Sequence, residues 1–196
     1  MRIGLMIAAA LMFVPAAAFA HPAIGDGHGF TQGLAHPLGG LDHILAMVAV
    51  GAFAWQLGGR ALWAVPATFI VVMTAGSALA IAGMAMPGVE IGIAVSVIAL
   101  GAIVALRVRP SVALAMGVVA LFAIFHGHAH GSEMPLEASS AAYAIGFMLA
   151  TALLHLAGIA LGFMIGRAGE LYGRLLYRLA GGFVALAGIA ILTYAI

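Results

Sequence analysis

Long apolar runs separated by short polar breaks dominate the chain. They show neither the alternation typical of β-strands nor the one-sided apolar pattern of helices in soluble proteins. A run of about 20 apolar residues matches the hydrocarbon thickness of a bilayer, so each such run predicts one membrane-spanning helix. The runs give six helices, at 38–57, 61–84, 89–106, 111–130, 139–165 and 175–194. Because the breaks are short, we expect an all-α integral membrane protein, with residues 36–196 forming one six-helix transmembrane bundle.

Residues 1–20 have the pattern of a secretory signal peptide. Arg2 provides an early positive charge, an apolar run follows, and Ala18-Phe19-Ala20 places small residues at the first and third positions of a cleavage site. We expect cleavage before His21, which leaves the mature N-terminus outside the cell. The alternative is an uncleaved first helix.

Residues 21–35 are rich in glycine and polar side chains and show no periodicity, so we expect a periplasmic loop. This segment contains His21, Asp26 and His28, which are candidates for capturing a metal ion outside the membrane. Imidazole suits nickel, copper and zinc alike. The alternative is an external tail without a binding role.

Composition supports a membrane protein and narrows its chemistry. Of 196 residues 65% are hydrophobic and only 7% are charged, against 45 to 50% apolar residues in ordinary soluble domains. A net charge of +1 argues against nucleic acid as a partner, because neutralising phosphates requires many more positive charges. The chain has no cysteine, so any metal must be bound by nitrogen, oxygen or thioether ligands.

The arginines follow the positive-inside rule. With the mature N-terminus outside, every arginine after Arg2 falls in a predicted inner loop, namely Arg60, then Arg107 and Arg109, then Arg167, Arg174 and Arg178. The outer segments contain acids instead, namely Asp26, Glu90, Glu133 and Glu137. We therefore expect a bacterial cytoplasmic (inner) membrane protein with both mature termini in the periplasm, whose acids raise the local concentration of cations.

The first candidate site is the sequence His-Pro-Leu-Gly-Gly-Leu-Asp-His at residues 36–43, at the start of the first predicted helix. A spacing of seven residues is close to two helical turns, so His36 and His43 are expected on one helix face about 10 Å apart, with Asp42 beside them. Charging such a group near the membrane centre costs roughly 2.5 to 3.5 kcal/mol, so ionisable residues there are functional candidates.

A second cluster lies at the outer end of the fourth predicted helix. His126 and His130 are four residues apart and Glu133 follows three later, so the three share one stripe, whereas His128 points away and is a weaker candidate. The two clusters are expected at the same membrane level. Together they predict a metal site built from separate helices.

Other polar groups have structural alternatives. Glu90 is either part of the path for the metal or a carboxylate stabilised by a helix N-terminus. His155 is deep in the fifth helix and is either the inner end of the path or a histidine satisfied by a neighbouring helix. Met47 is the one methionine that we consider as a soft ligand. Ser77 and Ser96 are expected to bond to helix carbonyls or to join helices.

Imidazole and carboxylate ligands suit Ni, Co, Zn and Cu(II). Transport requires binding that is weak enough to release the ion, which favours several partial sites in series. Two other functions use the same residues: a membrane-embedded zinc metallohydrolase, in which three ligands hold a catalytic ion, and a proton path. The chain has no Gly-x-x-x-x-Gly-Lys loop, so we expect no ATPase and no required cofactor.

These motifs resemble the HupE/UreJ family of nickel permeases. The resemblance rests on two motifs and a third-helix pattern. The first motif reads His21-Pro22, Gly29-Phe30, Gly33, His36-Pro37, Gly40, Asp42-His43 and Leu45-Ala46-Met47, the second runs from Phe125 to Glu133, and the third-helix pattern is Pro87-Gly88-Val89-Glu90 with Ser96. It implies six membrane helices, a cleaved signal peptide and a non-enzymatic secondary permease or channel-like carrier. Its implied substrate is Ni(II), or Co(II), taken up for nickel enzymes such as hydrogenase or urease.

Overall fold

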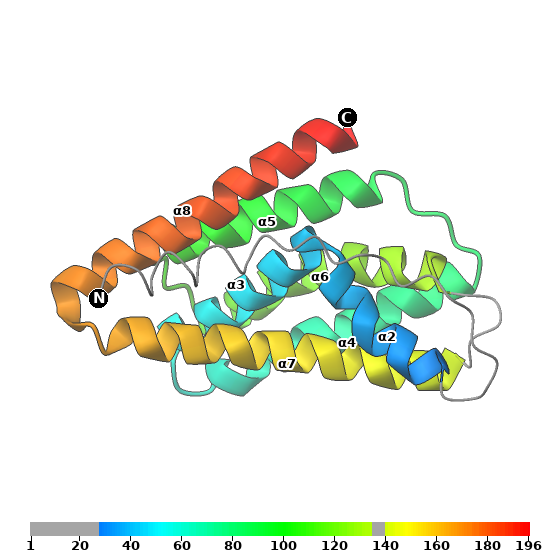
Figure 1. Ribbon diagram of the computed structural model, residues 1–196, viewed down its shortest axis with the longest axis horizontal. Coiled ribbons are helices and arrows are strands. Elements are labelled where there is room, and N and C mark those ends of the chain that lie inside the picture. The colour runs from blue at the N-terminus through cyan, green and yellow to red at the C-terminus, as the bar shows by residue number, and fades with distance from the viewer. Residues whose placement is uncertain (1–27, 135–139) are drawn as a thin grey trace, which may run out of the picture.

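The computed structural model describes residues 28–134 and 140–196, and within these residues every regular element is an α-helix (Figure 1). The helices, in chain order, are α2 (His28–Gly39), α3 (Leu41–Leu57), α4 (Ala61–Ile81), α5 (Val89–Leu106), α6 (Val112–Ser132), α7 (Ser140–Gly166) and α8 (Gly169–Ala195). The predicted signal peptide lies outside the described residues.

Five of these helices, α4 to α8, are long and apolar enough to cross a membrane, and the bent pair α2 and α3 makes six if it counts as one span. The expected all-α membrane bundle is therefore confirmed at this level. Helix α5 matches its predicted bounds, Val89–Leu106, residue for residue. Helix α8 begins at Gly169 instead of 175, so Arg174 lies inside this helix together with Arg178, and the prediction of a loop that contains them is wrong. Hydropathy finds where apolar side chains begin, whereas helical hydrogen bonding continues through polar residues.

The first span differs from the predicted straight helix. Residues from His28 onward, expected in a loop, form α2, and the axis then turns by 83° before α3 begins. Gly40 joins the two helices in an extended conformation, with φ −108° and ψ 122°. Pro37 lacks an amide hydrogen and the Gly39-Gly40 pair disfavours a helix, so the sequence breaks the helix here. His36 and His43 consequently lie on different helices, and the prediction that they share one helix face is wrong.

Helix α3 occupies the centre of the bundle and contacts α2 and each of α4 to α8. Around it α4 pairs with α6 and α5 with α8, while α2 lies across α7 (Figure 1). Glycines allow close approach: a Cβ on Gly51 of α3 would meet the carbonyl oxygen of His155, and a Cβ on Gly158 of α7 would meet that of Val48. Small residues at contacts between helices are typical of packing inside membranes.

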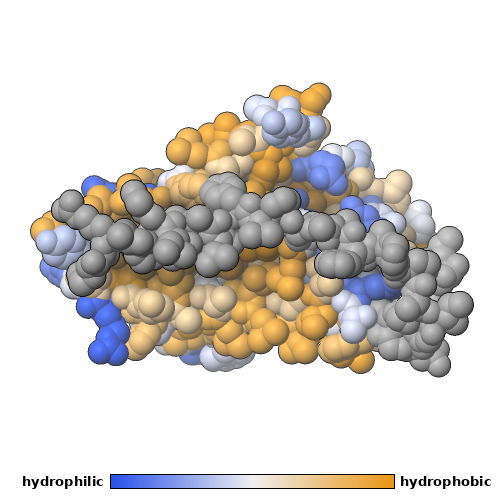
Figure 2. All heavy atoms as spheres, in the orientation of Figure 1, coloured by the Kyte–Doolittle hydropathy of each residue, from blue (hydrophilic) through white to orange (hydrophobic). Residues whose placement is uncertain are grey.

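Apolar side chains cover most of the visible surface, and most hydrophilic ones lie toward the two ends of the long axis (Figure 2). Large exposed side chains such as Trp63, Phe183 and Leu186 belong to the apolar surface, while Phe53, Phe69 and Met73 fill the interior. A soluble protein rarely exposes so much contiguous apolar area. The surface is that of a helical bundle in contact with lipid.

Candidate metal centre

An open cavity of about 570 Å³ lies where the break between α2 and α3 meets the C-terminal end of α6. The connections of the bundle place this end opposite the arginines, because Arg60, Arg107 and Arg167 follow the other ends of α3, α5 and α7. The cavity is lined by side chains of both predicted clusters, by the separate candidate Glu90 and by one residue not foreseen, Tyr143; the cluster residues are His36, Asp42, His43 and Glu133. Five helices or their ends, α2, α3, α5, α6 and α7, thus contribute to one opening.

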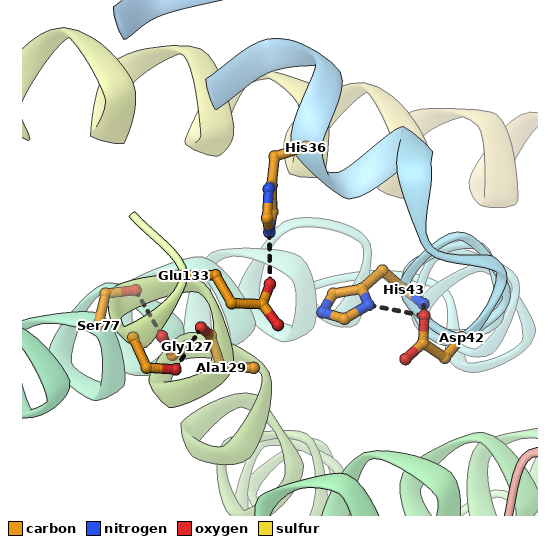
Figure 3. Close-up of polar contacts among 8 residues, drawn as sticks. His36, Asp42, His43, Ser77, Gly127, Ala129 and Glu133 are labelled. Atoms are coloured by element: carbon orange, nitrogen blue, oxygen red, sulfur yellow. Dashed lines mark hydrogen bonds and ion pairs between the residues drawn. The ribbon is translucent and has the colours of Figure 1, made fainter. Parts of the chain in front are cut away.

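His36 reaches across the cavity from α2. Its Nε2 atom lies 3.0 Å from Oε2 of Glu133, and both side chains are partly exposed, at 28% and 55% (Figure 3). Its ring also contacts His130, with 4.8 Å between ring centroids. The predicted association of the first cluster with the second is therefore present, although it is made by two helices that meet at an angle.

Asp42 and His43 form a bonded pair at the start of α3. Oδ1 of Asp42 accepts hydrogen bonds from the backbone N and from Nδ1 of His43, each at 2.8 Å (Figure 3). A carboxylate only accepts hydrogen bonds, so Nδ1 carries a proton and the neutral ring keeps its lone pair on Nε2. That Nε2 is buried and has no hydrogen-bond partner among the described residues. A carboxylate behind a histidine is the arrangement that orients histidine metal ligands.

Gly40 leaves the space that this pair occupies. A Cβ at Gly40 would lie 2.5 Å from Oδ1 of Asp42 and 2.9 Å from Nδ1 of His43, distances at which the carboxylate must move. The extended φ of Gly40 is one that any residue adopts. The glycine is therefore needed here for space.

Two histidines of α6 continue the cluster into the bundle. His126 and His130 are buried, with 0% and 1% exposure. The His43 ring lies 4.3 Å from the His130 ring and 4.9 Å from the His126 ring, measured between centroids. With His36, four imidazoles from α2, α3 and α6 are therefore in contact.

These side chains do not form a closed coordination shell. In residues 28–134 and 140–196 no three histidine or acidic side chains are arranged to hold an ion together. The imidazoles meet edge to face, with interplanar angles of 62° to 88° among His36, His43, His126 and His130. The cluster is a row of adjacent donors, which would have to rotate to share one ion.

The remaining candidates lie around this row. Glu90, in the first turn of α5, lines the cavity. Nε2 of His128 donates to the carbonyl oxygen of Met84, in the segment after α4, at 2.8 Å, on a different face of α6. Met47 is fully buried in the hydrophobic core one turn after His43. His155 is 1% exposed, and neither of its ring nitrogens has a partner in the described part of the chain.

The external capture residues are described only in part. His21 and Asp26 lie outside the described residues. His28 is the first residue of α2, so the prediction of a loop at this position is wrong. The capture role itself stays a prediction.

Sequence reasoning missed two aromatic residues that complete the site. Phe69 lies between His126 and His155, with ring centroids 5.6 Å and 5.1 Å away. Tyr143 of α7 lines the cavity and lies 5.9 Å from the His36 ring. Both residues fit an apolar helix pattern, so nothing in the sequence distinguishes them from core residues.

The comparisons with known proteins identify the family of this chain. The family model described as HupE / UreJ protein matches residues 9–191. The curated Protein HupE of Rhizobium leguminosarum bv. viciae is 47% identical over 183 residues, which cover 90% of this chain and 94% of that protein. No solved structure matches the chain. The family match over nearly the whole length shows that the chain belongs to the HupE/UreJ family.

Proposed function

We propose that this protein carries a divalent transition metal, Ni(II) or Co(II), across the cytoplasmic membrane into the cell for the assembly of nickel enzymes. The observation that supports this most is the row of four imidazoles, which starts at an open cavity with three carboxylates and continues into the buried interior. Membership of the HupE/UreJ family agrees with transport. The protein acts as a secondary permease or channel-like carrier.

Attraction of the ion begins with charge. Asp42, Glu90 and Glu133 all line the cavity, and none of the arginines in residues 28–134 and 140–196 lines it. The last turn of α2 also ends there, at Gly39, where the helix dipole is negative. Broken helices that direct their C-terminal ends at a cation site are a recurrent device in membrane transporters.

Removal of water from the ion requires replacement ligands, and neutral imidazole supplies them. His43 offers a lone pair on Nε2, its ring contacts that of His130, and the His130 ring in turn contacts that of His36. Imidazole suits nickel and cobalt, and carboxylates suit the hydrated ion. Because the donors are not closed around one point, binding is partial at each step, which favours release.

Beyond this row the path continues toward His155. The Phe69 ring contacts both His126 and His155, so an apolar ring lies between these two histidines. We assign His155 to the inner part of the path. The ion reaches the cytoplasmic side at the end that carries the arginines, with both mature termini in the periplasm.

Uptake by cells tests the proposal. Asp42→Ala and His43→Ala are expected to abolish nickel accumulation while the protein still inserts, because the first removes the carboxylate that orients the ring and the second removes the donor. Glu170→Ala, at the arginine end of the molecule, is the control. Normal accumulation in both site variants would reject the mechanism.

A flux assay with purified protein in liposomes identifies the substrate and separates the alternatives. Parallel measurements with Ni, Co, Zn and Cu give the selectivity. Turnover of a peptide or lipid without metal flux would favour the zinc metallohydrolase. Currents that persist after chelation of all divalent ions would favour a proton path.

A further inference from the structure

Ser96 of α5 makes a buried contact with the deepest histidine of the row. The Ser96 side chain is 0% exposed, and its Oγ lies 2.8 Å from Nε2 of His126. The same Oγ lies 2.6 Å from the carbonyl oxygen of Ile93, one turn earlier in α5. The bond to a helix carbonyl was expected from the sequence, whereas the contact with the imidazole was not.

The two contacts fix which atoms carry protons. A contact of 2.6 Å between a hydroxyl and a carbonyl oxygen requires a hydrogen between them, and the carbonyl has none to give. The Ser96 hydroxyl therefore donates to Ile93. Its oxygen can then only accept from His126, so Nε2 of His126 carries the proton.

The other ring nitrogen of His126 therefore carries no proton. Nδ1 of His126 holds the lone pair of the neutral imidazole. This atom is buried, and among the described residues it has no hydrogen-bond partner. An unpaired buried acceptor is costly, which indicates that the position serves a ligand.

We propose that Ser96 is a positioning residue that holds His126 in the tautomer and orientation in which Nδ1 is the metal-binding atom. The inference rests on the proposed transport function. It makes adjacent histidines offer different nitrogens: His43, tied to Asp42 through Nδ1, offers Nε2, and His126, tied to Ser96 through Nε2, offers Nδ1. Their rings are perpendicular, at 88°, so an ion changes donor plane as it passes between them.

The first test needs no metal. Nitrogen-15 NMR of the full protein in lipid, with ring-labelled histidine, distinguishes protonated from unprotonated ring nitrogens, and a His126→Ala sample identifies the signals of this ring. We expect a protonated Nε2 and an unprotonated Nδ1 at His126 in the wild-type protein. The opposite tautomer would overturn the inference.

The second test compares nickel uptake kinetics in Ser96→Ala, Ser96→Thr and Ser77→Ala. Ser77 is the matched control, because its hydroxyl also joins another helix to α6, at the carbonyl of Gly127 at 2.8 Å, beside His126. Loss of an outer partner of a metal-bound histidine typically costs 10- to 100-fold in affinity. We expect Ser96→Ala to raise the nickel concentration for half-maximal uptake about 10-fold.

The threonine variant keeps a hydroxyl that can bond to the carbonyl one turn earlier, so it should retain most of the affinity. Ser77→Ala should keep the wild-type value, and protein levels in the membrane are measured for all variants. Equal kinetics in Ser96→Ala and Ser77→Ala, or an unchanged His126 tautomer in Ser96→Ala, would refute the positioning role. If wild-type liposomes carry no nickel at all, the transport proposal fails instead, and the NMR result still decides the tautomer.

Discussion

At the scale of single residues, the site depends on hydrogen bonds that decide which nitrogen of each imidazole is free. Asp42 occupies Nδ1 of His43, so the buried Nε2 is left to bind. The bond is kept by the small size of Gly40, whose hydrogen faces Asp42 and His43 where a side chain would collide with both. Gly40, which has no side chain, therefore helps to decide that Nε2 of His43 is the metal-binding atom.

Gly40→Ala should accordingly impair metal handling without unfolding the protein. The extended backbone accepts alanine, but the new methyl group displaces the carboxylate, and His43 loses its partner. We expect the nickel concentration for half-maximal uptake to rise about 10- to 100-fold, the usual effect of losing such a partner. Gly39→Ala is the matched control, because a Cβ there meets nothing within 4 Å. Equal uptake by the two variants would contradict this role of Gly40.

At the scale of elements, α6 joins the site to the packing of the bundle. The face with His126 and His130 meets α2 and α3, and Gly127 between them packs against α4, where an added Cβ would collide with the carbonyl of Met73. The position of α6, and with it the positions of His126 and His130, is therefore fixed by the contact with α4 on the opposite face. Close contact between the α4 and α6 backbones can hold the histidines in place because protein interiors are densely packed and hardly compressible.

Gly127→Ala should destabilise this arrangement. Backbone must shift to admit the methyl group, and overpacking of this kind typically costs about 1 to 3 kcal/mol. Gly117→Ala, in the same helix, meets nothing within 4 Å and should be neutral or stabilising by up to about 1 kcal/mol, since alanine favours helices. Thermal unfolding of the two variants in detergent measures the difference. A Gly127→Ala protein as stable as Gly117→Ala would show that α4 and α6 are less tightly packed.

At the scale of the whole molecule, charge is separated along the long axis. The ends of the helices near the cavity carry Asp42, Glu90 and Glu133, while the opposite connections carry Arg60, Arg107, Arg109 and Arg167. Arg107 rests over the Tyr177 ring, 5.6 Å from its centroid, at this opposite end. From this distribution the positive-inside rule predicts that the cavity faces the periplasm.

This orientation can be measured directly because the chain has no cysteine. A membrane-impermeant maleimide should label Ser132→Cys, beside the cavity, in intact cells. It should label Arg109→Cys, which is exposed at the opposite end, only after the membrane is permeabilised. The reverse pattern would place the cavity in the cytoplasm and would turn the proposed uptake into export.

The sequence alone determined the class of protein, the positions of most helices and the residue types of the site. Apolar runs as long as a bilayer is thick form helices whatever their neighbours, so Val89–Leu106 was predictable to the residue. The cost of ionisable groups in lipid likewise identified His43, His126 and His130 before any coordinates.

Only the tertiary structure decided how these residues meet. The 83° bend at Gly40 separates His36 from His43 along the chain but brings both rings against His130, a relation that no helical periodicity describes. Phe69 and Ser96 belong to the site because α4 and α5 lie beside α6. Local patterns fix local structure, whereas a contact between residues 30 positions apart, such as Ser96 and His126, exists only once helices pack.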